Sequence, residues 1–263
     1  MALLAMSGDW HGELGWGIAV LRAAKDEGAS LLVQTGDFGF SWPGLDRVRA
    51  VDKLNKAAEN IGLPVLFVRG NHDNAPDFFK LQPEPEGYAK LREWIWYLPD
   101  GARVEWEEGV TIGGLGGATS SDAGWRLEDE ARRRKHRTLY WPEEVVDRRG
   151  AVRLMQGGPL DVLVSHDLPA GPWEEGYWRI SRDPGFERSA MIDKEIIAGV
   201  REATTPRLHV FGHWHIRKSI DTGQPGHLLE GLGMNGHRLG NLFSWDSETN
   251  KITDLEVKWG PKK

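Results

Sequence analysis

Short apolar runs recur along the chain, and each leads into Gly or Ser followed by Asp, Asn or His. The run ALLAM leads to SGDWH, SLLVQT to GDFG, LPVLFV to RGNHD, LDVLV to SHDLP, and RLHVF to GHWH. A nearly continuous apolar stretch of this length is typical of a strand buried on both faces. The pattern therefore predicts five buried strands, at residues 2–6, 30–35, 63–68, 160–164 and 207–211.

Helical periodicity fills some of the intervals between these strands. In residues 45–62 the apolar side chains that share one face are Leu45, Val48, Val51, Leu54 and Ala58. Residues 13–28 fit the same pattern, and so do residues 191–206, which Pro206 ends. Strands that alternate with helices predict an α/β protein with a largely parallel sheet.

The polar clusters all fall at the carboxyl ends of the predicted strands. In open parallel sheets, ligands bind just beyond this edge. A solvated loop explains any one cluster, but it explains five clusters of the same pattern poorly. The sequence thus predicts one site to which five strand ends contribute side chains.

The remaining segments predict a charged insertion and further strands. Residues 110–117 fit another strand, and residues 120–155 are highly charged without a strong apolar stripe, so we expect an inserted, helical, cap-like segment there. Its basic run of Arg132, Arg133, Arg134 and Lys135 is favoured as a solvated helix face over a phosphate-facing patch. Residues 217–222, 227–233 and 241–259 fit short strands that close a second sheet, with a hairpin turn at 247–250.

Composition narrows the class of protein. The 263 residues carry a formal net charge of −6, with 40% hydrophobic and 27% charged residues. This is typical of a globular protein, and we expect a single domain over residues 1–263. An acidic chain is a poor candidate for holding long nucleic acid by bulk charge.

The absence of cysteine excludes disulfides, thiolate zinc sites and a cysteine nucleophile. No segment has the length of a membrane span, and the short apolar start is no signal peptide, so we expect a cytoplasmic protein.

Two histidines one residue apart end the last of the five apolar runs. In an extended strand, His213 and His215 would leave the backbone on the same side, about 7 Å apart. This spacing fits a metal site, and it equally fits two histidines at a wet edge. Alone, the pattern does not decide between them.

The polar clusters together resemble a known family. Asp9 and His11 form D-x-H, Asp37 lies in GDFG, Asn71, His72 and Asp73 form GNHD, His166 lies in VSHD, and His213 and His215 form GHWH. In this order the clusters resemble the five signature motifs of calcineurin-like metallophosphoesterases, over residues 5–217. The resemblance implies a four-layer α/β/β/α sandwich with two mixed β-sheets and a metal site at the carboxyl ends of the strands.

The resemblance also implies a site for two divalent metal ions. Asp9, His11 and His215 would hold the first, Asn71, His166 and His213 would hold the second, and Asp37 would bridge them. Carboxylate, imidazole and amide ligands suit manganese, iron or zinc, of which we favour Mn²⁺. Two divalent ions and two carboxylates leave a charge of about +2, which favours a phosphate ester. A hydroxide that bridges the ions would attack phosphorus in line.

Further roles follow from the same resemblance. His72 would be the general acid that protonates the leaving oxygen, with Asp73 orienting it, whereas a plain turn residue is the alternative for His72. Arg69 either contacts the phosphate or has a structural role, and the sequence does not separate the two. Four tryptophans near the motifs would stack on a base or aryl group or, as we favour for each, pack beneath the site: Trp10, Trp42, Trp173 and Trp214.

Two departures from the family pattern bear on the substrate. The segment GDFGFSW lacks the arginine, and GNHD lacks the glutamate, that the protein serine/threonine phosphatases carry in these motifs. We therefore expect a phosphodiesterase that acts on small nucleotide-like diesters. A nuclease on short or single-stranded nucleic acid and a phosphomonoesterase are the alternatives. A non-catalytic scaffold is disfavoured because the ligand set is complete. No membrane partner is expected, and the oligomeric state is not indicated.

Overall fold

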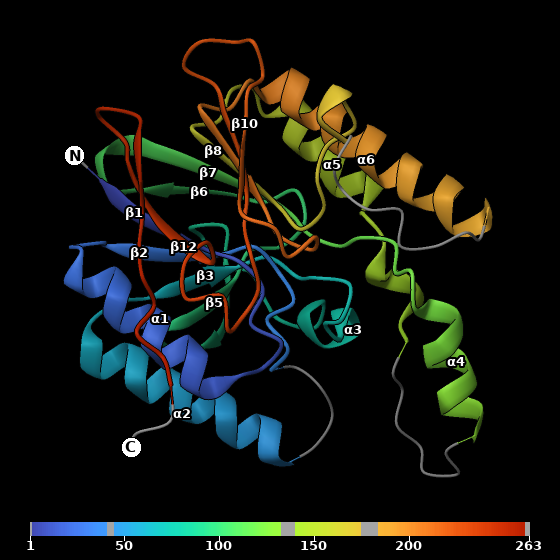
Figure 1. Cartoon of the computed structure of the whole chain (residues 1–263), viewed down its shortest axis with the longest axis horizontal. Helices are drawn as coiled ribbons and strands as arrows, with labels where there is room; N and C mark the ends of the chain where they lie inside the picture. The colour runs from blue at the N-terminus through green and yellow to red at the C-terminus, as the bar shows by residue number, and fades with distance from the viewer. Residues whose placement is uncertain (1, 41–44, 133–139, 175–183, 261–263) are drawn as a thin grey trace.

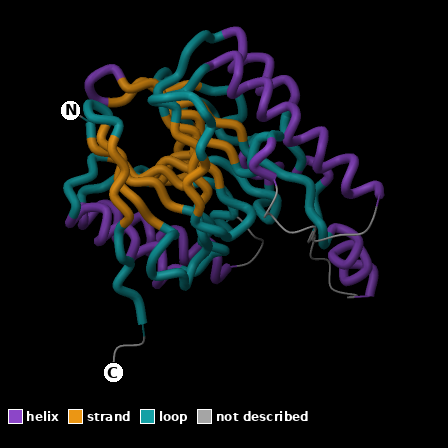
Figure 2. The backbone as a smooth tube through the Cα atoms, turned by 45° about the horizontal axis from the view of Figure 1, so that its top comes forward, coloured by secondary structure: helices purple, strands orange, loops and turns teal. Residues whose placement is uncertain are grey.

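Two mixed β-sheets lie face to face between two layers of helices (Figure 1). The computed structural model describes residues 2–40, 45–132, 140–174 and 184–260. In Figure 2 the strands occupy the centre of the molecule and helices flank them on two sides. The four-layer α/β/β/α arrangement with two mixed sheets is therefore confirmed.

The first sheet has seven strands within the described residues, in the order β13-β12-β1-β2-β3-β5-β4. Their bounds are β1 Leu3–Ser7, β2 Leu31–Gln34, β3 Val65–Phe67, β4 Ala89–Arg92, β5 Ile95–Tyr97, β12 Leu242–Asp246 and β13 Lys251–Asp254. The central strands β1, β2, β3 and β5 are parallel, and the edge strands pair antiparallel. Three of the predicted buried strands thus lie side by side.

The second sheet has six described strands, in the order β10-β11-β9-β8-β7-β6. Their bounds are β6 Arg103–Trp106, β7 Val110–Leu115, β8 Val162–Ser165, β9 Leu208–Phe211, β10 Lys218–Ile220 and β11 Leu228–Gly231. Strands β7, β8, β9 and β11 are parallel, with β6 and β10 antiparallel at the edges. The remaining two predicted buried strands, β8 and β9, are neighbours here.

Helices cover the outer faces of the two sheets. Their bounds are α1 Leu14–Asp26, α2 Leu45–Ile61, α3 Ala75–Phe78, α4 Ala123–Arg132, α5 Arg148–Gln156 and α6 Pro184–Thr204, with short 3-10 helices at Glu107–Gly109, Pro142–Glu144 and Pro172–Glu174. One apolar core joins α1 and α2 to the first sheet, another joins α5 and α6 to the second, and a third fills the space between the sheets. None of the described helices is both long and apolar enough to cross a membrane.

The C-terminal strands divide between the sheets, contrary to the prediction that all of them close the second sheet. Strands β10 and β11 join the second sheet, but β12 and β13 extend the first, where β12 pairs with β1. The reason is that Phe243 and Trp245 of β12 are buried in the core between the sheets. The predicted hairpin turn at 247–250 is present, and Asn250 closes it with a positive φ of 57°.

The charged segment at 120–155 is not a uniform cap. Helix α4 extends away from the body of the molecule (Figure 1), and its Arg132 is an exposed partner of Glu128, as a solvated face requires. Helix α5, in contrast, buries Ala151 and Leu154 against α6 and belongs to the outer helical layer. The predicted insertion is thus too long at its C-terminal end. Residues 133–135 lie outside the described residues.

Helix α2 confirms the predicted periodicity with one error. Val51, Leu54 and Ala58 are buried against the first sheet, whereas Val48 is 50% exposed. The side chain of Leu45, which the periodicity placed on the same face, lies outside the described part of the structure.

Candidate metal centre

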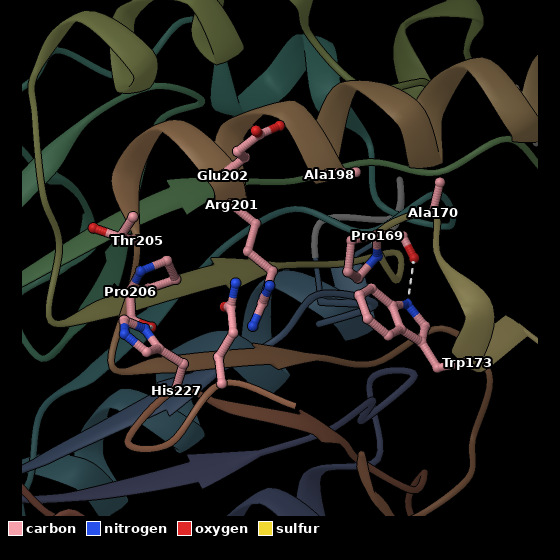
Figure 3. Close-up of a pocket in the computed structure, with 10 residues that line it drawn as sticks. Pro169, Ala170, Trp173, Ala198, Arg201, Glu202, Thr205, Pro206 and His227 are labelled. Carbon is pink, nitrogen blue, oxygen red and sulfur yellow. Dashed lines mark hydrogen bonds between the residues drawn. The ribbon is translucent and has the colours of Figure 1, made fainter. Parts of the chain in front are cut away.

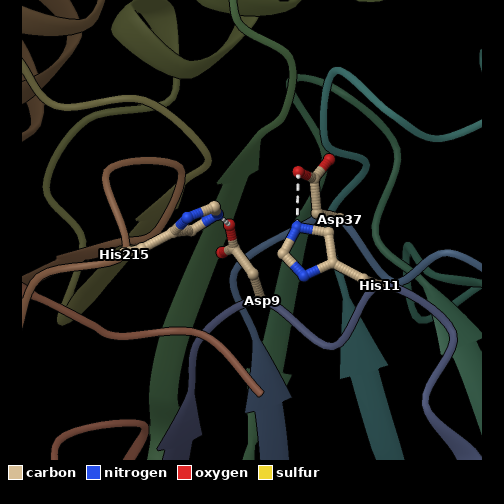
Figure 4. A group of neighbouring side chains, drawn as sticks. All are labelled: Asp9, His11, Asp37 and His215. Atoms are coloured by element: carbon tan, nitrogen blue, oxygen red, sulfur yellow. Dashed lines mark ion pairs between the residues drawn. The ribbon is translucent and has the colours of Figure 1, made fainter. Parts of the chain in front are cut away.

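All seven predicted ligands lie at one edge of the two sheets, just past the carboxyl ends of their strands. The first sheet positions Asp9, His11, Asp37 and Asn71 after β1, β2 and β3, and the second positions His166, His213 and His215 after β8 and β9. Four of these side chains form a compact group (Figure 4). The ligand atoms of Asp9, His11, Asp37 and His215 all lie within 4.8 Å of one another.

The first group has the protonation pattern of a metal site. His215 Nε2 lies 3.0 Å from Asp9 Oδ2, and His11 Nε2 lies 3.5 Å from Asp37 Oδ2. The other ring nitrogen of His11, Nδ1, lies 2.8 Å from Asn235 Oδ1 and donates to it. This contact fixes the ring and leaves Nε2 facing the carboxylates, as in metal-binding histidines whose second nitrogen is hydrogen-bonded.

A second group of ligand atoms meets at Asn71. Its Oδ1 lies 2.8 Å from His166 Nε2 and 3.0 Å from His213 Nδ1. His166 Nδ1 donates to the Thr35 carbonyl at 2.8 Å. Burial alone would lower the pKa of His166, but the charges of Asp37 and Asp9 raise it, so without metal Nε2 carries a proton that it donates to Asn71 Oδ1. A divalent ion would replace this proton, and the imidazole nitrogens and the amide oxygen of the group fit such an ion.

Asp37 joins the two groups. Its Oδ2 faces His11 in the first group, and its Oδ1 lies 3.5 Å from His166 Nε2 in the second. Burial favours the neutral acid, but the charges of His166, His72 and His11 outweigh it and hold the pKa of Asp37 well below its usual range. An ionised carboxylate with one oxygen toward each group is the geometry of a bridging ligand.

The ligands leave the backbone from turns and not from extended strands. His11, Asp37, His213 and His215 have φ of 47°, 49°, 62° and 58°, in the left-handed region. The predicted same-side geometry of His213 and His215 in a strand is therefore wrong. Because β9 ends at Phe211, the chain turns before both histidines, and this turn directs His213 to the second group and His215 to the first.

Two motif glycines allow the backbone to approach the ligands closely. A Cβ added to Gly70 would lie 2.1 Å from both the backbone nitrogen and Oδ1 of Asp37. A Cβ added to Gly36 would lie 2.5 Å from His166 Nδ1, and Gly36 also has a φ of +102°. The glycines of the motifs thus leave room for the metal ligands themselves.

The sequence profile of calcineurin-like phosphoesterases matches residues 4–217 of this chain. The chain belongs to that family. The matched range includes both ligand groups, and the family together with the cluster of Asp9, His11, Asp37 and His215 indicates a divalent metal site.

The fold of this calcineurin-like phosphoesterase is shared by a solved structure from a bacterium. TT1561 of Thermus thermophilus has 14% identity and a TM-score of 0.60, over 98% of this chain and 99% of the other. Two further structures are more distant. A novel archaeal phosphodiesterase has 12% identity and a TM-score of 0.43 over 97% and 99%, and Yfce, a phosphoesterase from E. coli, has 15% and 0.39 over 97% and 100%. No curated protein matches the chain in a sequence comparison.

His72 lies at the edge of the phosphoesterase site and is partly exposed. Its ring centroid lies 6.4 Å from that of His11, and its backbone N–H donates to Asp37 Oδ1 at 2.9 Å. The bridging carboxylate thus fixes the backbone of His72. The imidazole stands beside the first metal group without being part of either ligand set.

Asp73 holds the backbone of two turns that carry candidate ligands. Its carboxylate is fully buried and accepts hydrogen bonds from the backbone N–H groups of Gly70, Phe38 and Gly39 at 2.7–3.1 Å. These contacts tie the GDFG turn to the GNHD turn. The further role predicted for Asp73, that it orients the His72 ring, stays a prediction.

Arg69 has a structural role, which is one of the two roles that the sequence left open for it. The side chain is 1% exposed, and Nε donates to Asp100 Oδ2 at 2.7 Å. The two terminal nitrogens donate to the carbonyls of Glu143, Glu144 and Val145. A buried guanidinium held by these partners is not placed to reach a substrate.

Three of the four tryptophans pack, as we favoured. Trp10 is fully buried, and its indole N–H donates to Ser7 Oγ. Trp214 donates to Asp167 Oδ1 at 2.6 Å and packs in the same apolar cluster as Trp173. Trp42 lies outside the described residues.

Sequence reasoning missed the residues that hold the ligands in place. Asn235 orients His11, and its own backbone N–H donates to the Asp9 carbonyl at 2.7 Å. It follows β11 in the segment HLLEGLGMN, where Glu230 interrupts the apolar run and Met234 separates Gly233 from Asn235. This segment departs from the pattern of the five clusters, so the sequence gives only a weak signal for Asn235.

A buried network also supports Asn71 from the charged segment. Asn71 Nδ2 donates to Ser120 Oγ at 2.7 Å, and the Ser120 N–H donates to Glu144 Oε1. Glu144 Oε2 pairs with Arg126 of α4 at 2.6 Å, with both side chains buried. Because the Nδ2 group of Asn71 is held in this way, its Oδ1 faces the two histidines. No pattern in the sequence indicates these pairings.

Proposed function

We propose that this chain is a dinuclear metal-dependent phosphodiesterase that hydrolyses small nucleotide-like phosphodiesters. The observation that carries the proposal is Asp37, which presents one carboxylate oxygen to each of two ligand groups. When bound, two divalent ions supply Lewis acid activation of water and of the phosphoryl oxygens. The donors are carboxylate, imidazole and amide, and we propose Mn²⁺ as the physiological metal, with iron or zinc as the alternatives.

The chain itself supplies a proton donor. His72 stands beside the first ligand group, held through its backbone by Asp37. We propose that its imidazolium gives its proton to the leaving oxygen as the bond to phosphorus breaks. An alkoxide such as a ribose oxygen leaves poorly unless it is protonated, so this step matters most for natural diesters.

The preference for diesters over monoesters rests on where the arginines near the site are used. Arg69 and Arg126 bind buried carboxylates, and Arg47 donates to the carbonyls of Gly12 and Gly39. A monoester dianion carries one more negative charge than a diester, and none of these three side chains is placed to receive it. A diester, with one negative charge, suits a site whose positive charge comes from the metals.

The overall charge of the chain bears on the size of the substrate. A net charge of −6 opposes stable binding of long nucleic acid, so we propose a small diester as the partner.

A substrate panel tests the proposal. Manganese-loaded protein is assayed against bis-nitrophenyl phosphate, nitrophenyl phosphate, cyclic nucleotides and single-stranded DNA, with Asp37→Asn as the control for activity of this site. We expect kcat/KM to be larger for diesters than for monoesters, and activity to be lost in Asp37→Asn. A much larger kcat/KM for the monoester overturns the diester assignment, and efficient cleavage of DNA favours a nuclease.

A further inference from the structure

A pocket whose lining contains none of the candidate metal ligands lies between α6 and the loops beside it (Figure 3). Its cavity has a volume of about 330 Å³ and is lined by the carboxyl-terminal turns of α6, the loop after His166, and the chain before β9 and β11. Thr205 and Pro206 precede β9 and His227 precedes β11, whereas the metal ligands follow β9. The pocket thus combines the chain before β9 and β11 with the loop that follows β8.

Arg201 is the charged group of this pocket. It comes from the last turn of α6 and points into the cavity in Figure 3, whereas its neighbour Glu202 points away. Its Nε is buried and has no hydrogen-bond partner within the described part of the chain. Burial lowers the pKa of Arg201, and no carboxylate among the described residues offsets the effect. A partly buried guanidinium without an anionic partner is costly, since buried charges are normally paired.

Trp173 holds the guanidinium by its face. The Cζ of Arg201 lies 5.8 Å from the centroid of the indole ring, and the indole N–H donates to the Pro169 carbonyl at 2.9 Å, which fixes the ring. A cation–π contact uses the flat face of a guanidinium. Arg201 makes no hydrogen bond within the described residues, and Nε is buried, so the two terminal nitrogens are the groups that a carboxylate or phosphate oxygen would reach.

The rest of the lining is mixed. Pro169, Ala198 and Pro206 supply apolar walls, and Gln224 supplies an amide. His227 Nδ1 donates to the Pro206 carbonyl at 2.9 Å, which orients that ring. A pocket of this size, with apolar walls and a few placed polar groups, is typical of a small-molecule site.

We propose that this pocket binds a small organic anion, whose carboxylate or phosphate group pairs with Arg201 and whose apolar body lies against Trp173. The site is separate from the metal centre and does not depend on the phosphodiesterase assignment. The short segment from His166 to Trp173 joins the two sites along the chain.

The test uses benzoate and phenylphosphonate as probes on the full chain with zinc bound, because zinc is diamagnetic and leaves the spectra sharp. Two-dimensional ¹⁵N spectra follow the indole N–H of Trp173, which is assigned by its absence in Trp173→Phe. We expect both probes to shift this resonance with saturation. The probe that binds with the higher affinity shows whether the site prefers a carboxylate or a phosphate-like group.

Three variants separate this pocket from the metal centre. Arg201→Gln should weaken binding about tenfold or more, as expected for the loss of a charge-assisted hydrogen bond. Arg188→Gln, an exposed arginine on the same helix, should leave it unchanged. Asp37→Asn should remove phenylphosphonate from the metal centre and leave the shift of Trp173 intact.

The outcomes decide the proposal. If Arg201→Gln binds both probes as well as Arg188→Gln does, or if neither probe shifts Trp173, the pocket is not an anion site. If Arg201 only stabilises the end of α6, Arg201→Gln should have a lower melting temperature, and neither probe should change the melting temperature of either protein. Should Arg201→Gln fail to fold, Arg201→Lys retains the charge without the fork and is expected to bind phenylphosphonate more weakly than wild type. Equal affinity in Arg201→Lys would also contradict the proposal.

Discussion

Asp37 is the residue on which both ligand groups depend. Asp37→Asn should reduce the metal content of both sites, because it removes the charge that the two groups share. His11→Ala should reduce mainly the first, since His11 belongs to that group. Elemental analysis after dialysis against limiting manganese measures both effects. Fully active protein with one ion per chain would contradict the two-metal site.

The role of His72 is tested by the leaving group. General acid catalysis contributes roughly 10²–10⁴-fold where a proton is required. His72→Ala should therefore keep both metals and lose most activity on nucleotide diesters. Its loss on bis-nitrophenyl phosphate should be much smaller, because a nitrophenolate leaves without protonation.

The ratio of the two losses is the informative quantity, since it cancels errors in the active fraction. Equal losses on both substrates, in step with lost metal, would show that His72 has only a structural role. Near-normal activity on alkyl diesters would show that another group delivers the proton.

His11 makes metal binding depend on pH. Burial alone would lower its pKa, but the hydrogen bond and charge of Asp37, with the charge of Asp9, raise it to about 9 in the metal-free protein. Below that pH a metal ion must displace a proton from His11. Affinity at the first site should therefore rise from pH 6.5 to 9, by up to about tenfold per unit for one proton.

The same shift has a consequence for stability. Because the folded pKa of His11 lies above its ordinary value of 6.5, the protonated form stabilises the metal-free fold. This contribution is complete below pH 6.5 and is lost as the pH rises through 9. Chelator competition and thermal melting at about pH 6.5, 7.5 and 8.5 measure the two trends, which run in opposite directions. A flat metal affinity would contradict the pKa of His11.

Among single residues, the sequence indicated the candidate ligands but not the residues that hold them in place. The resemblance to the family implied Asp9, His11 and the other candidate ligands, and the structure brings their side chains together in two groups. The structural roles of Arg69 and Asp73 could not be predicted from the sequence, because these roles depend on which atoms face the two side chains in the fold. A buried arginine that binds Asp100 and three carbonyls has the same sequence context as one that reaches a phosphate.

Among the elements, α4 is linked to the metal centre through one buried ion pair. Arg126 binds Glu144, and Glu144 in turn holds Ser120 against Asn71. Arg126→Met should lower the melting temperature and the activity, because breaking a buried pair leaves an unpaired charge, at a cost of about 3–5 kcal/mol.

Arg132→Met provides the matched control on the same helix. Its pair with Glu128 is exposed and should contribute at most about 1 kcal/mol. The double variant Arg126→Met with Glu144→Gln should recover part of the lost stability, since it removes the unpaired carboxylate. Thermal melting and kcat/KM on a diester check all three. An Arg126→Met protein as stable as Arg132→Met would argue against the link.

The sequence predicted which segments are helices and strands, but it did not predict which strands pair with one another. The apolar runs indicated every buried strand of the site, because burial on both faces is visible in the sequence. The same runs do not say which sheet a strand joins, so β12 and β13 were predicted in the second sheet and lie in the first. Similarly, Val48 fits the helical face of α2 by spacing, yet its side chain is half exposed.

For the whole molecule, the two ligand groups connect the two sheets. Each group takes residues from both: Asp9, His11 and Asp37 meet His215, and Asn71 meets His166 and His213. Bound metal should therefore stabilise the packing of sheet on sheet. At about 100 times its Kd, a ligand that binds only the folded state contributes about 2.7 kcal/mol per site.

We accordingly expect manganese to raise the melting temperature and a chelator to lower it again. His213→Ala should show a smaller rise than wild type, because it removes part of the contribution of the second sheet to one site. Arg188→Gln, which changes an exposed residue, should show the same manganese-induced rise in melting temperature as the wild type. A melting temperature that does not respond to manganese in active protein would mean that the metals do not join the sheets.

The left-handed backbone conformation of four candidate ligands implies a trade-off between stability and activity. Outside glycine, such a backbone conformation costs about 1–2 kcal/mol per residue, and His11, Asp37, His213 and His215 all adopt it. Glycine at any of these positions would relax the turn, but it would also delete a ligand. Selection for a more stable fold therefore cannot act here without loss of catalysis. The thermally weakest part of the metal-free chain is expected to be the part that performs the reaction.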